Sequence, residues 1–222
     1  MRVYPVSHHH DNNTSLEQAA IAFAAGSDGV FLISHTGKDN ELIPLAAWLK
    51  VNYGPGRIGV NLLNSTIAAA NIIARRNGID LLWVDDAGIN SAGVAPITEW
   101  LVSQRAERGG PQIFASVAFK YQPNEPDPPR AAATAARLGM IPTTSGVATG
   151  VAPTIAKIAA MRAACGDRLA VANGMTVDNV GEYLPYVTDF LVASDVSRDF
   201  NHFDPIRLKV FVDRVKRARP AA

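Results

Sequence analysis

Short apolar runs alternate with longer mixed stretches along the whole chain. The runs are rich in Val, Ile, Leu and Phe, a composition typical of parallel strands that are buried on both faces. They predict eight strands, at residues 3–7, 29–33, 57–63, 81–84, 113–119, 140–144, 169–172 and 190–193.

A stretch with helical character follows each predicted strand. The expected helices lie at residues 16–25, 42–51, 66–76, 96–108, 130–138, 151–164, 177–184 and 206–219. Ser15 is a predicted cap of the first helix, and Asp204 followed by Pro205 is a typical start for the last. Eight strand–helix units with short connections favour a closed barrel over an open sheet. The sequence therefore predicts a compact single-domain (βα)8 TIM barrel over residues 1–222.

Composition narrows the class of protein and of partner. Hydrophobic residues make up 48% of the 222 residues, as expected for a globular domain, and the formal net charge is only +1. That balance predicts no nucleic-acid partner. Cys165, the single cysteine, is expected to pack at a helix end in a reducing compartment.

The chain shows no leader-like segment and no apolar run long enough to span a membrane, so we expect a cytoplasmic protein. Trp48, Trp83 and Trp100 are candidates either for the core or for an interface between copies of the chain. A homo-oligomer therefore remains one alternative.

Polar residues follow the apolar runs where the predicted strands end. Active sites of TIM barrels lie at this carboxyl end of the strands. The residues at these positions are His8, His35, Asn61, Asp85, Asp86, Lys120, Ser145, Asn173, Gly174, Ser194 and Asp195. This pattern predicts a pocket for a small substrate.

Two aspartates and a lysine are the first candidates for acid–base chemistry. Asp85 and Asp86 are adjacent, so only one of them faces the barrel axis, as a general base or as a partner of ribose hydroxyls. Both also fit an ordinary loop or cap role. Lys120 fits an acid, a base, a Schiff-base nucleophile or a partner of a substrate phosphate. His8 or His35 is a further acid–base candidate, and Asn61 would orient the substrate.

Residues 169–195 predict an anion site. A strand ends in a glycine turn, a helix is expected after Thr176, and the next strand ends in Ser194. Unpaired N–H groups in these turns and at the helix start, with the Gly174 backbone and two hydroxyl groups, would bind phosphate. Asn173 and Asp195 flank this site.

Ser145 and Thr149 belong to a glycine-rich turn that is expected to line the same pocket. The turn lacks the Gly-Lys-Ser/Thr ending of a phosphate-binding loop, which excludes a nucleoside triphosphatase of that type.

A pair of histidines after the first strand raises a metal-dependent alternative. His8 and His10 lie two residues apart, as in metal-dependent hydrolase barrels, but such sites need further histidines after later strands. Only His35 and His202 remain for that purpose. We therefore predict no metal site and no cofactor, and a divalent metal at His8 and His10 stays the alternative.

Four segments resemble one known family. They are TSGVATG at 144–150, NGMTVDNV at 173–180, DFLVAS at 189–194 and DPIR at 204–207. Their order and spacing resemble the BtpA-like family of ribulose-phosphate-binding-type barrels, named for a photosystem I biogenesis factor. The resemblance implies a barrel fold, with His8 and Lys120 at the ends of the first and fifth strands. Asn173 and Ala193 stand near positions where the family has glycine, so the predicted anion site is narrower here.

These observations favour an enzyme that acts on a small anionic substrate, a phosphorylated or ribosylated metabolite. Isomerase, lyase and glycosyl transfer or cleavage all need an anion anchor and an acid–base pair. The family resemblance implies a second hypothesis, a non-catalytic assembly or biogenesis factor. A metal-dependent hydrolase that uses His8 and His10 is the third.

Overall fold

A closed ring of parallel strands forms the centre of the molecule. The computed structural model describes residues 1–55, 57–108 and 110–218. The barrel strands are β1 (Arg2–His8), β2 (Val30–Ile33), β3 (Ile58–Asn61), β4 (Leu81–Val84), β7 (Gln112–Ser116), β8 (Ile141–Thr144), β9 (Ala170–Ala172) and β10 (Asp189–Val192). They pair in parallel around the barrel in chain order, and β10 closes on β1. This confirms the predicted TIM barrel.

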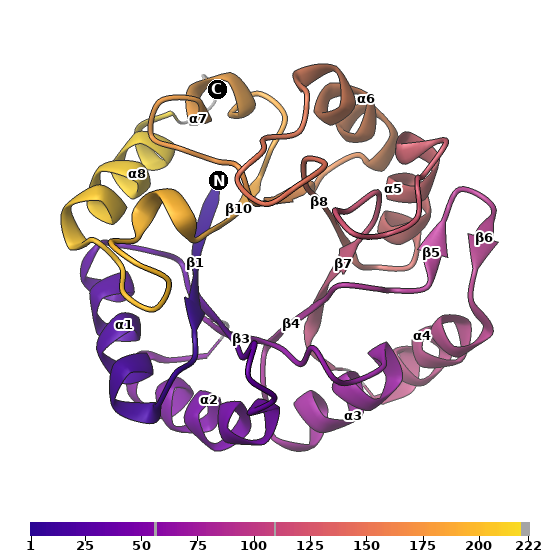
Figure 1. The fold of residues 1–222 in the computed structure, drawn as a ribbon. Coiled ribbons are helices and arrows are strands. Elements are labelled where there is room, and N and C mark those ends of the chain that lie inside the picture. The colour runs from indigo at the N-terminus through magenta and orange to yellow at the C-terminus, as the bar shows by residue number, and fades with distance from the viewer. Residues whose placement is uncertain (56, 109, 219–222) are drawn as a thin grey trace.

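A ring of helices surrounds the strands (Figure 1). The helices are α1 (Asn12–Ala24), α2 (Asp39–Tyr53), α3 (Ile67–Arg76), α4 (Pro96–Arg108), α5 (Pro128–Arg137), α6 (Ile155–Cys165), α7 (Val180–Tyr183) and α8 (Pro205–Arg217). Each lies within its predicted unit. Arg219, the predicted end of the last helix, lies outside the described residues. No described helix combines the length and the apolar character that a membrane crossing requires.

Three predicted helix starts are wrong, and the simplest case is the helix predicted from 151, which begins at Ile155 after its cap Thr154. Asp11 rather than Ser15 caps α1, because its carboxylate accepts the backbone N–H of Thr14 at 2.8 Å. Ser15 is buried inside the helix instead. The helix predicted at 177–184 is only the single turn Val180–Tyr183, because the residues before it form hydrogen-bonded turns.

Asp204 caps α8 as predicted and accepts the backbone N–H groups of Ile206 and Arg207. A short hairpin of β5 (Ile89–Asn90) and β6 (Gly93–Val94) between β4 and α4 was not predicted. Its two-residue strands are too short to leave an apolar pattern.

Aromatic side chains fill the barrel interior. The Phe31 ring lies edge-on to Tyr4 and Phe114, with centroids 5.7 and 5.2 Å away. Gly59 makes room for it, since a Cβ there would lie 2.3 Å from the Phe31 ring. A second apolar layer, between the strands and the helices, includes Cys165, which is buried at the end of α6 as predicted. The barrel interior is therefore a packed core that side chains fill.

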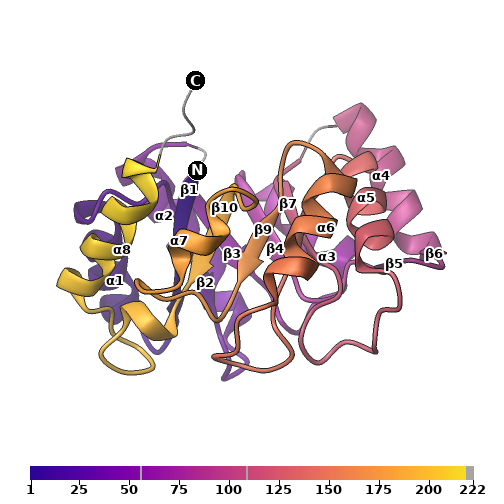
Figure 2. The same ribbon diagram turned by 90° about the horizontal axis from the view of Figure 1, so that it is seen from above.

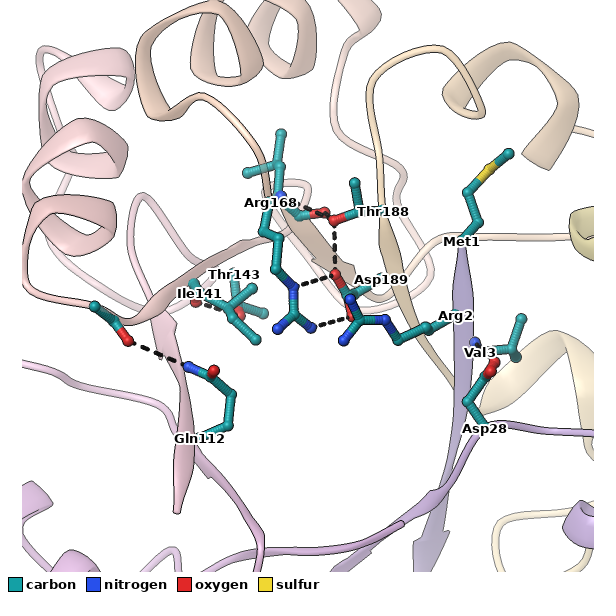
Figure 3. A network of polar contacts seen from close by, with 12 residues as sticks. Met1, Arg2, Val3, Asp28, Gln112, Ile141, Thr143, Arg168, Thr188 and Asp189 are labelled. Atoms are coloured by element: carbon teal, nitrogen blue, oxygen red, sulfur yellow. Dashed lines mark hydrogen bonds and ion pairs between the residues drawn. The ribbon is translucent and has the colours of Figure 1, made fainter. Parts of the chain in front are cut away.

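An ion pair network closes the amino end of the barrel (Figure 3). The carboxylate of Asp189 is fully buried. It accepts hydrogen bonds from Arg168, at 2.6 and 3.2 Å, and from the Thr188 hydroxyl at 2.6 Å. Arg2 lies 3.8 Å from the same carboxylate. Figure 2 shows the N-terminus on this side, while the long connections after β7, β8 and β10 lie on the opposite side.

Candidate functional site

A cavity of about 900 Å³ opens at the carboxyl end of the barrel strands. Its apolar floor includes Val6, Ile33, Trp83 and Phe119. The predicted site residues that line it are His8, His35, Asp85, Asp86, Lys120, Thr149, Asn173, Gly174, Thr176, Ser194 and Asp195. Asn61 and Ser145 lie behind the wall and contact residues that line it. The fold thus brings the predicted residues into one place.

Two histidines from neighbouring strands lie side by side on the wall. The rings of His8, at the end of β1, and His35, just after β2, have centroids 5.1 Å apart. Phe200, from the β10–α8 connection, packs edge-on against His8 at 4.1 Å. Burial, together with His35 and Lys120, lowers the pKa of His8 to about 4. At neutral pH the His8 imidazole is therefore uncharged.

The pKa of His35 is also lowered. Burial is the main cause and Lys120 adds to it, whereas Asp85 acts in the opposite direction. The Asp85 carboxylate is therefore within electrostatic reach of the His35 imidazole.

The two adjacent aspartates have different partners. Asp85 accepts a hydrogen bond from the Asn61 amide at 2.9 Å, and Asn61 is buried at the end of β3. Gln122 donates to the Asp85 backbone carbonyl at 2.6 Å. Asp86 accepts the backbone N–H of Gly88 at 2.8 Å, the turn role that was the alternative from sequence. Asp85 is therefore the better positioned of the two for chemistry.

Lys120 reaches the cavity from the connection after β7. Its ammonium group donates to the Thr149 hydroxyl at 3.1 Å, and the Tyr121 hydroxyl lies 3.0 Å from the same oxygen. Ser145 holds the Lys120 backbone, because its hydroxyl accepts the Lys120 N–H at 2.8 Å. Ser145 thus orients Lys120 from outside the cavity.

Lys157 of α6 is a part of this arrangement that the sequence did not indicate. Its ammonium group donates to the carbonyls of Ala118 at 2.7 Å and Ser145 at 2.9 Å. The Thr144 hydroxyl also donates to the Ala118 carbonyl, at 3.0 Å. Ala118 has a φ of 48°, so these bonds stabilise a backbone conformation that residues other than glycine rarely adopt. Neither a lysine in a helix nor an alanine in a loop carries a sequence pattern that would reveal this contact.

The turn after β9 packs against the β8–α6 connection. Asn173 accepts the backbone N–H of Gly150 at 2.8 Å and donates to the Ala148 carbonyl at 2.7 Å. At Gly174, with a φ of 75°, a Cβ would lie 2.4 Å from the backbone N of Ala152. This glycine is therefore required by backbone packing, and a substitution such as Gly174→Trp would displace the loop.

The expected contribution of the α7 start to the anion site is not seen. The backbone N–H of Thr176 donates to the Asn179 side chain at 2.9 Å, and that of Val177 donates to the Asp195 carboxylate at 3.0 Å. The Thr176 hydroxyl in turn accepts the N–H of Asn179. The two N–H groups already have partners inside the protein, whereas the Thr176 hydroxyl only accepts and can still donate its proton to a ligand. A single helical turn has little dipole to add.

Other backbone N–H groups in these turns remain for an anion. Those of Gly174, Met175 and Ser194 make no hydrogen bond within the described part of the chain. All three residues line the cavity, from the turns after β9 and β10. Unpaired N–H groups from two adjacent turns are suited to an oxyanion.

The first-strand histidines do not form a metal site with their neighbours. His10 is exposed, and His9 is buried outside the barrel interior, where it contacts Ser15 and Glu41 at 2.8 and 3.1 Å. Across the described ranges, no three His, Cys, Asp or Glu side chains come together in a way that would hold a metal ion.

Solved structures with the same fold cover almost the whole chain. Phosphoribosyl anthranilate isomerase from Thermus thermophilus matches with a TM-score of 0.72 and 16% identity, over 99% of this chain and 100% of that one. A structure named native KDPGal gives 0.71 and 14%, over 98% and 96%. The isomerase from Thermotoga maritima gives 0.69 and 17%, over 97% and 98%. At these identities the likeness is one of fold.

No protein-family model matches the sequence, and a search of curated proteins finds no match. The resemblance to the BtpA-like family therefore stays a prediction at the level of the family, whereas the barrel it implied is confirmed.

Proposed function

We propose that this protein is an enzyme that acts on a small phosphorylated or ribosylated metabolite, by isomerisation, lyase chemistry or glycosyl transfer or cleavage. One observation carries the proposal. A single cavity of about 900 Å³ combines unpaired backbone N–H groups with an acid–base set at the carboxyl end of a TIM barrel.

The cavity wall divides into two functional halves. The turns after β9 and β10 offer the N–H groups of Gly174 and Ser194, and Lys120 adds an ammonium group to that side. The ends of β1 to β4 offer His8, His35 and Asp85. A substrate held by its anionic group on the first half would place its sugar carbons against the second.

Proton transfer is the chemistry that the second half supports. His35 has the Asp85 carboxylate within electrostatic reach, so it can take up and return a proton during the reaction. His8 is neutral and beside it, so it can accept a proton or donate a hydrogen bond. Asn61 holds Asp85 in place through its amide. The solved structures of like fold include isomerases by name, which agrees with this class of reaction.

A thermal-shift screen against phosphosugars and nucleotides, with phosphodiesters and carboxylates in the same panel, tests the proposal. A ligand at a hundredfold excess over its dissociation constant adds ~2.7 kcal/mol to stability, which raises Tm by roughly 5–10 °C in a domain of this size. Lys120→Met should remove most of the shift given by an active compound. Lys209→Met, on the exposed side of α8 where Lys209 pairs with Asp213, is the matched control and should keep it. A panel without any stabilising compound would count against an anion-binding enzyme.

A non-catalytic assembly factor is the second candidate, and one surface feature favours it. Tyr121, Val147 and Phe200 lie on three of the connections at the carboxyl end of the barrel, with exposures of 82%, 85% and 62%. Exposed apolar side chains of this kind often contact a partner protein. Alanine at Asp85, Asp86 and Lys120 together distinguishes the two: biological activity that survives this change would identify the assembly role.

A further inference from the structure

The charged side chains on the cavity wall are mostly acidic. Asp85, Asp86 and Asp195 line the cavity, and Lys120 is the single lysine or arginine among its described lining residues. The lowered pKa values of His8 and His35 favour the uncharged form of both imidazoles at neutral pH. Three carboxylates and one ammonium group give the wall a formal charge of −2, before any ligand binds.

Asp195 is the carboxylate nearest in the chain to the proposed anion position. It follows Ser194, one of the residues with an unpaired N–H group, and it lines the same cavity. Its Oδ2 atom accepts the backbone N–H of Val177 at 3.0 Å, so the carboxylate bridges the turns after β9 and β10. A fixed negative charge therefore lies between the two turns that would hold the ligand.

Electrostatic repulsion by this carboxylate grows with the charge of the ligand. In a partly buried site the interaction of two charges is stronger than in water, and it scales with the product of the charges. A phosphate monoester carries close to two negative charges at neutral pH, whereas a phosphodiester or a carboxylate carries one. Asp195 thus opposes a monoester about twice as strongly, in free energy, as it opposes a diester.

We propose that Asp195 determines the charge of the ligand, so that the cavity takes a singly charged oxyanion in preference to a phosphate dianion. This inference rests on the proposed function, because it specifies the anion of that same site. A phosphodiester and a carboxylate share the required chemistry, and the experiment separates them.

Asp195→Asn tests the inference without removing the turn contact, because the Asn Oδ1 atom can still accept the Val177 N–H. Binding is followed by the NMR shifts of the Gly174 and Ser194 amides. The probes are methyl phosphate, dimethyl phosphate and acetate, at pH 7.5 with a chelator. Asp178→Asn is the matched control. Asp178 follows Val177 on the β9–α7 connection, but it is exposed and does not line the cavity.

The wild-type protein should bind dimethyl phosphate or acetate about threefold more tightly than methyl phosphate, and the tighter of the two identifies the source of the oxyanion. Asp195→Asn should strengthen methyl phosphate binding about tenfold and dimethyl phosphate binding only about threefold, in proportion to charge. At pH 5, where methyl phosphate carries a single charge, the gain for methyl phosphate should fall to that for dimethyl phosphate. Asp178→Asn should change neither affinity by more than about twofold, since it removes the same charge from exposed surface.

Two results would overturn the inference while leaving the anion site in place. One is wild-type protein that prefers methyl phosphate and does not respond to Asp195→Asn. The other is preferential binding of methyl phosphate once Mg²⁺ replaces the chelator, since a cation would then neutralise the carboxylates. If none of the probes shifts the Gly174 or Ser194 amide in either protein, the proposed function fails together with the inference.

Discussion

At the scale of single residues, His8 shows how packing sets the charge of a site. Its ring lies between His35 and Phe200, and its Nδ1 atom is buried without a hydrogen-bond partner in the described part of the chain. An imidazolium there would lose hydration and face the positive charge of Lys120. The neutral form is therefore favoured down to acidic pH, which keeps the ring available as a proton acceptor.

The lowered pKa of His8 makes stability depend on pH. The folded protein protonates His8 near pH 4, whereas the unfolded chain does so near the ordinary value of 6.5. The unfolded state thus binds more protons between these values, and stability falls as the pH drops from 6.5 to 4, by on the order of 3 kcal/mol from this group. Urea unfolding at pH 7, 5 and 4 should show a shallower loss in His8→Gln than in the wild type. An equal slope in the two proteins would show that His8 titrates normally.

Phe200 is expected to contribute to this effect through burial. Phe200→Ala should raise the pKa of His8 toward its ordinary value, as measured by NMR titration of the imidazole, because the edge-on ring contact at 4.1 Å is lost. Phe200→Leu, which keeps an apolar side chain at this position, should leave most of the shift in place. If the pKa of His8 stays near 4 in Phe200→Ala, residues other than Phe200 are responsible for its burial.

At the scale of elements, one lysine joins three segments of the barrel mouth. Lys157 projects from α6 and donates to carbonyls in the connections after β7 and β8. Burial lowers the pKa of its ammonium group to about 8. The same connections carry Lys120 and Thr149, so the position of Lys120 on the cavity wall depends on a residue outside that wall.

Lys157→Met should loosen the connection that carries Lys120. We expect a stability loss of about 1–3 kcal/mol from the unpaired carbonyls, and faster hydrogen exchange at the Lys120 amide, whose N–H donates to Ser145. Lys50→Met is the matched control, since Lys50 also donates to a loop carbonyl, that of Gly78, in another part of the barrel. It should lower stability without changing exchange at Lys120. Unaltered exchange in Lys157→Met would limit Lys157 to a general stabilising role.

At the scale of the whole molecule, the two ends of the barrel have separate tasks. The carboxyl end carries the cavity, while the amino end is closed by Asp189 with Arg168, Arg2 and Thr188 (Figure 3). Asp189 is the first residue of β10, which pairs with β1 and so completes the ring. Closure of the barrel thus relies on a buried charge that is fully paired.

Asp189→Asn should destabilise the protein by about 3 kcal/mol, because it leaves the Arg168 guanidinium without its carboxylate in a partly buried position. Tm should fall by roughly 6–12 °C. Asp213→Asn removes an exposed pair on α8 and should cost less than about 1 kcal/mol. The change in the NMR shift of the Gly174 amide on ligand binding should be the same in both variants, since the ion pair network lies at the other end of the barrel. A loss of Tm no larger than that of Asp213→Asn would show that the arginines do not depend on Asp189.

The sequence by itself determined the eight strand–helix units, the closed barrel, and the residues that follow each strand. Apolar runs indicate buried strands. Because the carboxyl ends of all strands in a parallel barrel lie at the same end of the barrel, His8, Asp85 and Lys120 could be identified without any knowledge of contacts. The Asp204 cap of α8 was equally visible, because its bonds join residues within three positions of each other.

Only the tertiary structure decided which of these residues have partners. Asp195 meets Val177 across 18 positions and Lys157 meets Ala118 across 39. Gly174 is fixed by the backbone of a different unit, and Ser145 faces Lys120 rather than the cavity. Such contacts depend on how far each loop folds back over the barrel. A pattern of polar and apolar residues reports which face of a strand or helix is buried. It does not report which distant residue a loop side chain contacts, so these partners could not be read from the sequence.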